Sequence, residues 1–462
     1  MQRIRDPLHD LIEFKTDDEL ESHLWRVVQS RPFQRLRRIK QLGFSDLVYP
    51  GASHSRLIHS LGVFHTARQL MKVINRASDV IQSPSRENRA MAAALVHDLG
   101  HGPFSHAFEK VGERLGLKLA DHELVSDALI RDGEVAEILN DMGSGFASDV
   151  ADIIKGEGNI TVHNAVVSSQ FDADRLDYMR RDRLMSGSEH AAIDFTWLIN
   201  NLEIGTIPIG VDEQKTGDVN TFVLGSKAIY AAEAYVLGLF QLYPTVYFHK
   251  ATRCLEKIFT ELFVRIVALA LDSSSNRTGL PQNHPILLFI RDPENLEAVL
   301  DLDDSVIWGA LPLLANANDS VVAELASRLR DRKLFKCVDI RSRVVHALDP
   351  ASQGTPTHIE KIDRCCEAIK EKLTEWTDRR DGNLPAILID EATRSPYKRN
   401  AGLLGRINIR TDGGELVDLK EQSQVVASLK DFKLLRAYHD HGDDGSLELI
   451  NSTILREVSA CQ

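Results

Sequence analysis

A sequence that ends a helix and carries two kinds of metal ligand lies at residues 97–103, His97-Asp98-Leu99-Gly100-His101-Gly102-Pro103. The preceding run, residues 91–96, is apolar and is typical of a buried helix. Glycine and proline end that helix, so we expect His97 and Asp98 at its C-terminal end. Adjacent side chains inside a helix point about 100° apart, but at a helix end both can face one ion. The sequence therefore predicts a metal site.

Two further ligand candidates lie far from this pair in the chain. His59 occupies an apolar helical stretch, where a histidine by itself is typical of a core residue with a satisfied ring. Asp174 belongs to the acidic stretch at residues 171–178. With His97 and Asp98, these residues supply two nitrogens and two oxygens. This set suits a divalent transition metal (Fe, Mn, Zn or Ni) and leaves open positions for water and a phosphate oxygen.

Three more histidines follow the His97-Asp98 pair, at His101, His106 and His122. Uncharged imidazole rings in a core need hydrogen-bonding partners, so packing alone explains such a cluster poorly. Clusters of titratable groups mark functional sites. Imidazole can also transfer protons near neutral pH, which suits hydrolysis of a phosphate ester.

The composition is that of an ordinary globular protein, with 462 residues, 43% hydrophobic and 26% charged. The net charge of −12 gives no indication of nucleic-acid binding, although a local basic pocket is compatible with it. Five cysteines without a CxxC spacing favour a reducing compartment. We find no signal peptide and no stretch long enough to span a membrane, so we expect a cytoplasmic protein with no membrane partner.

The order His … His-Asp … Asp resembles the signature of the HD phosphohydrolase superfamily. The surrounding sequence at residues 6–9, 33–43, 49–56 and 97–106 is similar to the dNTP triphosphohydrolases. It is closest to the catalytic domain of the sterile-alpha-motif and HD-domain dNTPases. The resemblance implies a phosphoric ester hydrolase that cleaves a dNTP to the deoxynucleoside and triphosphate, through attack of water or hydroxide on the α-phosphorus. It also implies a homo-oligomer, a dimer or a tetramer, and Mg²⁺ accompanying the nucleotide is a further expectation.

The resemblance assigns roles residue by residue. His122 matches the catalytic histidine, with Asp121 or Glu123 as candidates to orient it, and His101 and His106 match histidines that line the phosphate site. The residues that match substrate contacts are Arg56 and Arg175 for the phosphates, Tyr178, Asp182 and Gln41 for the sugar, and Tyr247 for the base. Asp177 and Arg181, four residues apart, have the spacing of a simple ion pair on a helix surface.

Two departures from the family bear on the substrate. Residues 239–246 lack the arginines that grip the triphosphate in the family, and Pro244 is expected to interrupt or kink any helix there. Arg37 of the family's effector pocket is retained, but Gln29 stands where an acidic reader of guanine is expected. Two alternatives therefore stay open. The first is hydrolysis of another nucleotide, namely a monophosphate, an alarmone or an oligonucleotide end. The second is a nucleotide-sensing assembly.

The expected fold is mainly α, an HD-domain helical core with a small α/β C-terminal lobe. We expect the HD core over residues 1–200 and a helical continuation with a small hairpin over residues 201–345. The C-terminal lobe is expected over residues 346–462. Two hairpins are predicted, one from residues 202–209 and 221–224, and one around Thr411-Asp412-Gly413-Gly414. A strand is expected at residues 384–389.

Overall fold

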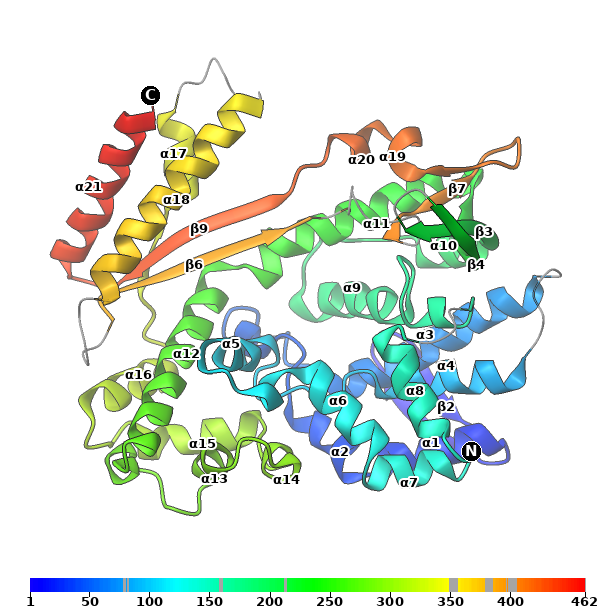
Figure 1. Cartoon of the computed structure of the whole chain (residues 1–462), viewed down its shortest axis with the longest axis horizontal. Coiled ribbons are helices and arrows are strands. Elements are labelled where there is room, and N and C mark those ends of the chain that lie inside the picture. Colours follow the sequence, from blue (N-terminus) through cyan, green and yellow to red (C-terminus); the bar gives the residue numbers. More distant parts are fainter. Residues whose placement is uncertain are drawn as a thin grey trace. The chain divides into compact units, whose positions relative to one another are not determined.

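Figure 1 shows a computed structural model of the chain, which describes residues 1–77, 80, 83–157, 161–211, 214–348, 356–378, 385–395, 397 and 405–461. The fold is mainly α with small sheets, which confirms the expected class. The chain divides into two compact units. Unit 1 comprises residues 1–247, 282–309 and 396–430, and unit 2 comprises residues 248–281, 310–395 and 431–462. The three-part division expected from the sequence stays a prediction.

Unit 1 holds most of the helices and two of the sheets. Its α-helices are α1 (Glu19–Gln29), α2 (Arg31–Arg35), α3 (Arg56–Arg76), α4 (Pro84–Val96), α5 (His106–Leu115), α6 (His122–Arg131), α7 (Glu134–Asn140), α8 (Phe146–Lys155), α9 (Ala173–Ser186), α10 (Phe195–Asn200), α11 (Ile229–Leu242), α13 (Pro285–Arg291), α14 (Leu296–Leu300), α19 (Leu419–Gln422) and α20 (Gln424–Ser428). Its strands are β1 (Gln2–Asp6), β2 (Asp10–Phe14), β3 (Leu202–Val211), β4 (Gln214–Gly225), β7 (Asn408–Arg410) and β8 (Leu416–Asp418).

Unit 2 is built from α12 (Lys250–Leu271), α16 (Ser320–Arg330), β5 (Lys336–Asp339), α17 (Ile340–Ala347), α18 (Pro356–Asp378), β6 (Ile387–Arg394), β9 (Phe432–His439) and α21 (Asp444–Cys461). Helix α15 (Asp304–Leu314) continues from unit 1 into unit 2. Short 3₁₀ turns are η1 (Leu36–Arg38), η2 (Gly43–Leu47), η3 (Lys118–Ala120), η4 (Asn164–Val166), η5 (Ser226–Ala228) and η7 (Ser275–Thr278). The turn η6 (Tyr243–Tyr247) is π-helical, which agrees with the expected interruption at Pro244.

The helix α3 forms the centre of unit 1. It is buried along most of its length, and α4 and α9 pack against it. Gly62 permits the close approach of α9, because a Cβ atom there would lie 2.1 Å from Oδ1 of Asp177. Helix α9 is capped at its start by Asp172, whose side chain accepts a hydrogen bond from the backbone N–H of Arg175 at 2.7 Å. Local capping and packing thus fix the helices that carry the acidic stretch.

Both predicted hairpins are present. Strands β3 and β4 are antiparallel, with Leu202 opposite Leu224. Strands β7 and β8 are also antiparallel, with Ile409 opposite Val417. They join in one sheet of order β3-β4-β7-β8, in which β4 and β7 run parallel. The strand expected at residues 384–389 corresponds to β6, which begins at Ile387, while Leu384 lies outside the described residues.

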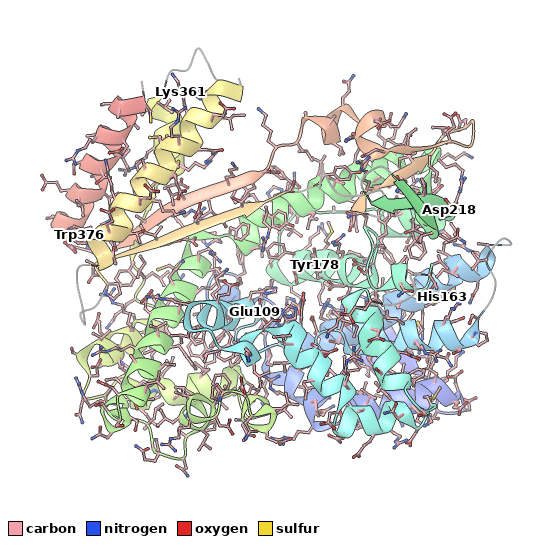
Figure 2. All side chains as sticks on the ribbon, in the orientation of Figure 1. Glu109, His163, Tyr178, Asp218, Lys361 and Trp376 are labelled. Carbon is pink, nitrogen blue, oxygen red and sulfur yellow. The ribbon has the colours of Figure 1, made fainter. Side chains whose placement is uncertain are left out.

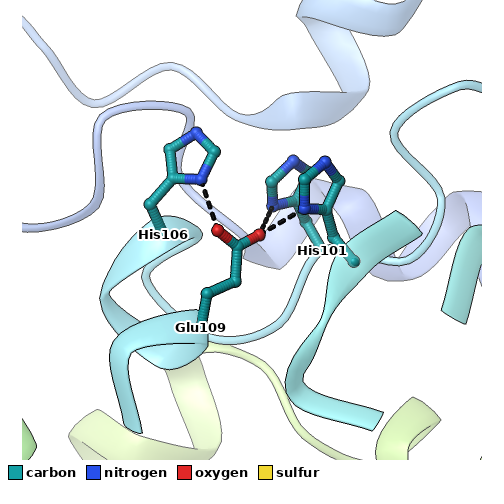
Figure 3. A group of neighbouring side chains, drawn as sticks. His101, His106 and Glu109 are labelled. Atoms are coloured by element: carbon teal, nitrogen blue, oxygen red, sulfur yellow. Dashed lines mark hydrogen bonds and ion pairs between the residues drawn. The ribbon is translucent and has the colours of Figure 1, made fainter. Parts of the chain in front are cut away.

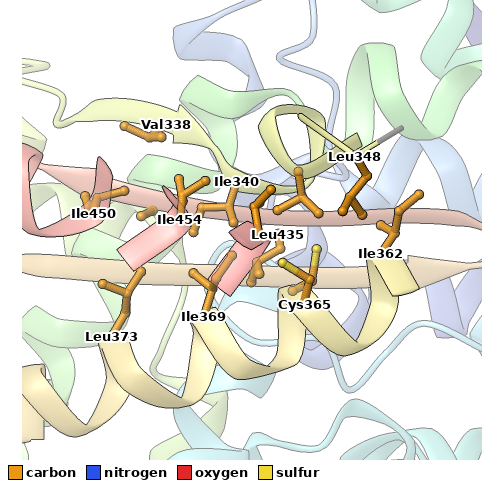
Figure 4. Packing of buried hydrophobic residues seen from close by; sticks show 14 of the residues in the cluster. Val338, Ile340, Leu348, Ile362, Cys365, Ile369, Leu373, Leu435, Ile450 and Ile454 are labelled. Carbon is orange, nitrogen blue, oxygen red and sulfur yellow. The ribbon is translucent and has the colours of Figure 1, made fainter. Parts of the chain in front are cut away.

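The second unit is a three-stranded antiparallel sheet, of order β5-β9-β6, packed against helices. Apolar residues recur along α18 at helical spacing, and those of α21 and β9 meet them in one core (Figure 4). In Figure 2, Lys361 and Trp376 mark positions near the two ends of α18. The labelled core residues of α18 are Ile362, Cys365, Ile369 and Leu373.

No helix of the described residues is both long enough and apolar enough to cross a lipid bilayer.

We predict that Ile369→Ala destabilises the protein by about 2–5 kcal/mol, because Ile369 is fully buried and its truncation leaves a cavity. The change in free energy of unfolding is measured from urea titrations. The control is Leu455→Ala on α21, whose side chain is 68% exposed and which should change stability by about 0.5 kcal/mol or less. Equal effects of the two substitutions would contradict the assignment of this core.

Candidate active site

The pair His97-Asp98 stands where the sequence predicts it. Helix α4 is buried from Ala90 to Val96, and His97 is its C-terminal cap. The following turn is tied to α6, because the Ser126 hydroxyl accepts a hydrogen bond from the N–H of Gly100 at 2.9 Å. A Cβ atom at Gly100 would lie 2.2 Å from the carbonyl oxygen of His122. The glycine therefore allows α6 to bring His122 against this turn.

The four candidate metal ligands lie together in unit 1. Ligand atoms of His59, His97 and Asp98 are all within 4.8 Å of one another. Oδ1 of Asp174 lies 3.0 Å from Nε2 of His59 and 3.7 Å from Nε2 of His97. Nε2 of His97 is also 3.4 Å from Oδ1 of Asp98. Residues separated by more than a hundred positions along the chain thus converge at one point.

The donor set fits a divalent cation. Nε2 of His59 and Nε2 of His97 are buried nitrogens without a hydrogen-bond partner, and both face carboxylate oxygens. Burial lowers the pKa of His59, but the contacts with Asp174 and Asp177 outweigh burial and raise that pKa to about 10. The cluster therefore favours positive charge at this point, which is what a metal ion supplies.

Asp98 has a second partner that holds its charge. The guanidinium of Arg56 donates a hydrogen bond to Oδ2 of Asp98, and its Nε donates to the hydroxyl of Ser105 at 2.7 Å. Burial alone would raise the pKa of Asp98, but Arg56 and the adjacent histidines hold it well below its usual range. The phosphate contact expected for Arg56 stays a prediction, since in this structure the residue is 3% exposed and supports Asp98.

The histidines that follow the pair converge on a carboxylate, Glu109, that sequence reasoning missed (Figure 3). Nδ1 of His106 lies 2.7 Å from Oε2 of Glu109, Nδ1 of His122 contacts Oε1, and Nδ1 of His101 lies 3.7 Å from Oε1. The rings of His101 and His122 are stacked, with centroids 3.9 Å apart. The available signal was the position of Glu109 three residues after His106, which places both on one face of α5.

The partner of His122 is therefore different from the two candidates next to it in sequence. The carboxylate of Asp121 instead caps α6 by accepting from the N–H of Glu123 at 2.8 Å. Burial lowers the pKa of His122, but the hydrogen bond to Glu109 outweighs it, so the pKa is raised. Burial and the charge of Arg56 lower the pKa of His101 well below its usual range. Of these two histidines, His122 is therefore the one that binds a proton more readily.

The four residues His101, His106, Glu109 and His122 also satisfy the distances for a cation site. Both carboxylate oxygens of Glu109 already contact an imidazole nitrogen. In the first cluster Nε2 of His59 and Nε2 of His97 are buried without hydrogen-bond partners, as are Nδ1 of His101 and Oε1 of Glu109 in the second. The first cluster supplies both imidazole and carboxylate donors, and its role as the metal site stays a prediction.

A cavity of about 650 Å³ joins the two clusters. Its lining includes His97, Asp98 and Asp174 from the first cluster and His122 from the second. Arg175 also lines it, and its guanidinium donates to the carbonyl oxygen of Ser169 at 2.9 Å and faces Asp172. The acidic side chains in the lining are Asp98, Glu123, Asp127, Glu157 and Asp174, and the basic ones are Lys155 and Arg175.

The residues expected to contact sugar and base form a separate group in unit 1. Asp182 is buried and accepts hydrogen bonds from His54 and from the hydroxyl of Tyr247, both at 2.9 Å. The ring of Tyr178, labelled in Figure 2, lies edge-on to that of Tyr247 at 6.4 Å between centroids. Oε1 of Gln41 is buried without a hydrogen-bond partner. The structure brings Tyr178, Asp182 and Tyr247 together, and the substrate contacts stay predictions.

Comparisons with known proteins agree with this geometry. A model of the HD domain matches residues 56–179, which contain both clusters. The YwfO protein of Bacillus subtilis, named as uncharacterized, is 33% identical over 339 residues, 72% of this chain and 71% of that protein. This chain belongs to the HD-domain family of dNTPase-like proteins.

Two further proteins that this chain resembles are named as hydrolases. The deoxynucleoside triphosphate triphosphohydrolase SAMHD1 of mouse is 29% identical over 376 residues, which is 73% of this chain and 54% of that protein. The chain thus matches about half the length of the mouse enzyme. The crystal structure of a phosphohydrolase from Bacteroides thetaiotaomicron has a TM-score of 0.70 at 26% identity, covering 95% of this chain and 100% of that chain.

After Glu109, Asp177 is a second residue whose role at the site the sequence did not indicate. The ion pair with Arg181 exists, with Nε of Arg181 2.7 Å from Oδ2 of Asp177, but both side chains are 0% exposed. The expected surface pair is therefore wrong. Oδ2 of Asp177 also lies 2.9 Å from Nδ1 of His59. Because the whole network is enclosed between α3 and α9, spacing along α9 alone could not indicate it.

We predict that Asp174→Asn removes most of the metal that co-purifies with the protein, because it replaces a charged carboxylate donor with a neutral amide. The Asp174 side chain is 37% exposed, so its neutralisation should leave the fold intact. Metal content is measured by elemental analysis. The control is Glu123→Gln, which lines the same cavity outside the ligand cluster and should keep its metal. Full metal content in Asp174→Asn would exclude Asp174 as a ligand.

Proposed function

We propose that this HD-domain phosphohydrolase cleaves dNTP to the deoxynucleoside and inorganic triphosphate. The observation that supports the proposal best is the single cavity lined by both the histidine–aspartate cluster and His122. A hydrolase of phosphate esters needs a centre that stabilises phosphate charge and a proton donor for the leaving oxygen. The relative from mouse, SAMHD1, is named for this reaction.

The ligands that we propose for the metal are His59, His97, Asp98 and Asp174. When bound there, a divalent metal supplies Lewis-acid stabilisation of phosphate charge and lowers the pKa of water. Arg56 keeps Asp98 ionised, and an ionised carboxylate is the form that binds metals. His101 and His106 are proposed to line the phosphate site, and Arg175 to contribute a fixed positive charge to the same cavity.

His122 is proposed as the general acid. Its Nδ1 contacts Glu109, and the hydrogen bonds to His106 and His122 outweigh burial and lower the pKa of that carboxyl below its usual range. An ionised Glu109 requires a proton on Nδ1, so Nε2 is the nitrogen that can carry the proton to the leaving oxygen. This arrangement favours the imidazolium, which is the form that can donate a proton.

The charge of the cavity gives a physical reason to test the alternative substrates. Five carboxylates and two basic side chains contribute to its lining, and the segment at residues 239–246 contains no arginine. A triphosphate needs more positive partners than a monophosphate. Either Mg²⁺ enters with the nucleotide, or the substrate is a monophosphate, an alarmone or an oligonucleotide end. If the substrate is a dNTP, Mg²⁺ accompanies it. Gln41, Tyr178 and Asp182 then contact its sugar, and Tyr247 contacts its base.

The cytoplasmic location and the dimer or tetramer stay predictions.

The reaction is tested by product analysis on a panel of nucleotides with Mn²⁺, Fe²⁺, Zn²⁺, Ni²⁺ or Mg²⁺ added. We expect deoxynucleoside and inorganic triphosphate from dNTPs, and loss of both products after chelation. Release of nucleoside or monophosphate from the other substrates alone would replace dNTP by that class. Metal-loaded protein that turns over no nucleotide, but binds one, would favour the nucleotide-sensing assembly.

We predict that His122→Gln lowers kcat by about 10²–10⁴-fold while metal content is kept, because the substitution removes a proton donor and no metal ligand. Elemental analysis and turnover of the same preparation check this. Wild-type turnover in the folded variant would remove His122 from the reaction, and loss of metal would make it a ligand.

The pH profile tests the pairing of His122 with Glu109. A general acid works in its protonated form, so the rate should fall as pH rises through the raised pKa of His122. Glu109→Gln removes the charge that raises this pKa, and the falling limb of kcat should move to lower pH. The control is Glu113→Gln on the same helix, whose carboxylate is 72% exposed and which should leave the profile unchanged. An unmoved limb in Glu109→Gln would contradict the pairing.

A further inference from the structure

The N-terminal hairpin contains two polar side chains that face the interior. Asp6 is the last residue of β1, and His9 lies in the turn, residues 7–9, that joins β1 to β2. Oδ1 of Asp6 accepts hydrogen bonds from the N–H groups of Leu8 and His9, at 2.9 and 2.7 Å. The Asp6 side chain is 0% exposed and that of His9 is 4% exposed. Polar side chains this buried need specific partners.

Those partners lie on α9. Nε2 of His9 lies 2.7 Å from Oδ1 of Asp177, and Nη1 of Arg181 donates to Oδ2 of Asp6 at 2.8 Å. Arg181 also donates from Nε and Nη2 to the two oxygens of Asp177, at 2.7 and 2.9 Å. The hairpin is thus bonded to both members of the buried ion pair.

Asp177 connects this network to the candidate metal centre. Its Oδ2 lies 2.9 Å from Nδ1 of His59. An ionised carboxylate only accepts hydrogen bonds, and the paired guanidinium of Arg181 keeps Asp177 ionised. The proton in this bond lies on Nδ1 of His59, so Nε2 is the nitrogen that faces Asp98 and Asp174 and that a metal would bind.

The surrounding packing allows little movement of Asp177. A Cβ atom at Gly62, one turn after His59 on α3, would lie 2.1 Å from its Oδ1 and 2.2 Å from Nη2 of Arg181. Four donors from His9, His59 and Arg181 occupy the two oxygens of the carboxylate. Bonds from a fixed carboxylate restrict both the tautomer and the rotation of the imidazole that it contacts.

We propose that Asp177 is a positioning residue that orients His59 toward the metal, and that the N-terminal hairpin acts on the metal centre through it. Asp6 and His9 hold Arg181 and Asp177 in place, so residues at the start of the chain set the metal affinity of a ligand fifty positions later. This proposal rests on the metal site proposed above.

The test measures the affinity of full-length protein for Co²⁺, from its d–d absorption and by competition with a chelator. Asp177→Asn is expected to weaken Co²⁺ binding by about 10–100-fold, as loss of a carboxylate behind a ligating histidine does elsewhere. The absorption band should also shift, because the asparagine no longer fixes the ring of His59. His9→Ala should weaken binding in the same direction by a smaller factor.

A conservative variant and a neighbouring histidine separate positioning from general loss of structure. His9→Gln keeps a side-chain N–H donor toward Asp177, so it should restore much of the affinity lost in His9→Ala. The control is His65→Ala, which should keep wild-type affinity, because its ring lies 4.7 Å from that of His9 but its Nε2 contacts Gln69 at 3.4 Å. Urea titrations of each variant report stability separately.

Wild-type Co²⁺ affinity and an unshifted band in both Asp177→Asn and His9→Ala would overturn the proposal. If Asp177→Asn does not fold, the comparison of His9→Ala with His9→Gln decides, and equal affinities in those two variants would overturn it. Wild-type protein that binds neither Co²⁺ nor Zn²⁺ would overturn the metal site itself, and this inference with it.

Discussion

Buried carboxylates between α3 and α9 must be neutralised, and this requirement organises the centre of unit 1. Asp177, Asp98 and Asp6 are almost fully buried, and an unpaired buried charge would cost several kcal/mol. Arg181 pairs with Asp177 and Asp6, and Arg56 pairs with Asp98. The helices can pack closely only where these pairs are complete, so ion pairing and helix packing depend on each other.

The same pairing divides the histidines into two chemical types. His59 and His97 have one nitrogen engaged and one buried without a hydrogen-bond partner, which suits metal ligands. His106 and His122 instead share one carboxylate, Glu109, which suits proton transfer. A single segment, residues 97–106, contributes to both because Gly100 allows α6 to approach. Two successive residues of that segment, Phe104 and Ser105, have positive φ angles of 57°, which is uncommon for residues other than glycine.

Arg56 and Arg175 show how a resemblance between sequences differs from a structural role. Both match phosphate contacts of the family, yet here Arg56 is bonded to Asp98 and Ser105, and Arg175 to Ser169. A guanidinium has five N–H donors, so these bonds leave donors for a phosphate. The acidic side chains of the cavity, however, offset much of the positive charge that a polyphosphate would need.

The sequence by itself determined the class of fold, the two hairpins and the end of α4 at His97. These features depend on local periodicity, on glycine and proline, and on turn residues. It also indicated the ligand candidates His59, His97, Asp98 and Asp174, since their residue types and order are unusual. Only the tertiary structure decided their partners. Glu109 rather than Asp121 contacts His122, and Asp177 is buried rather than on a surface, because both contacts join segments whose distance in space is set by helix packing and not by spacing along the chain.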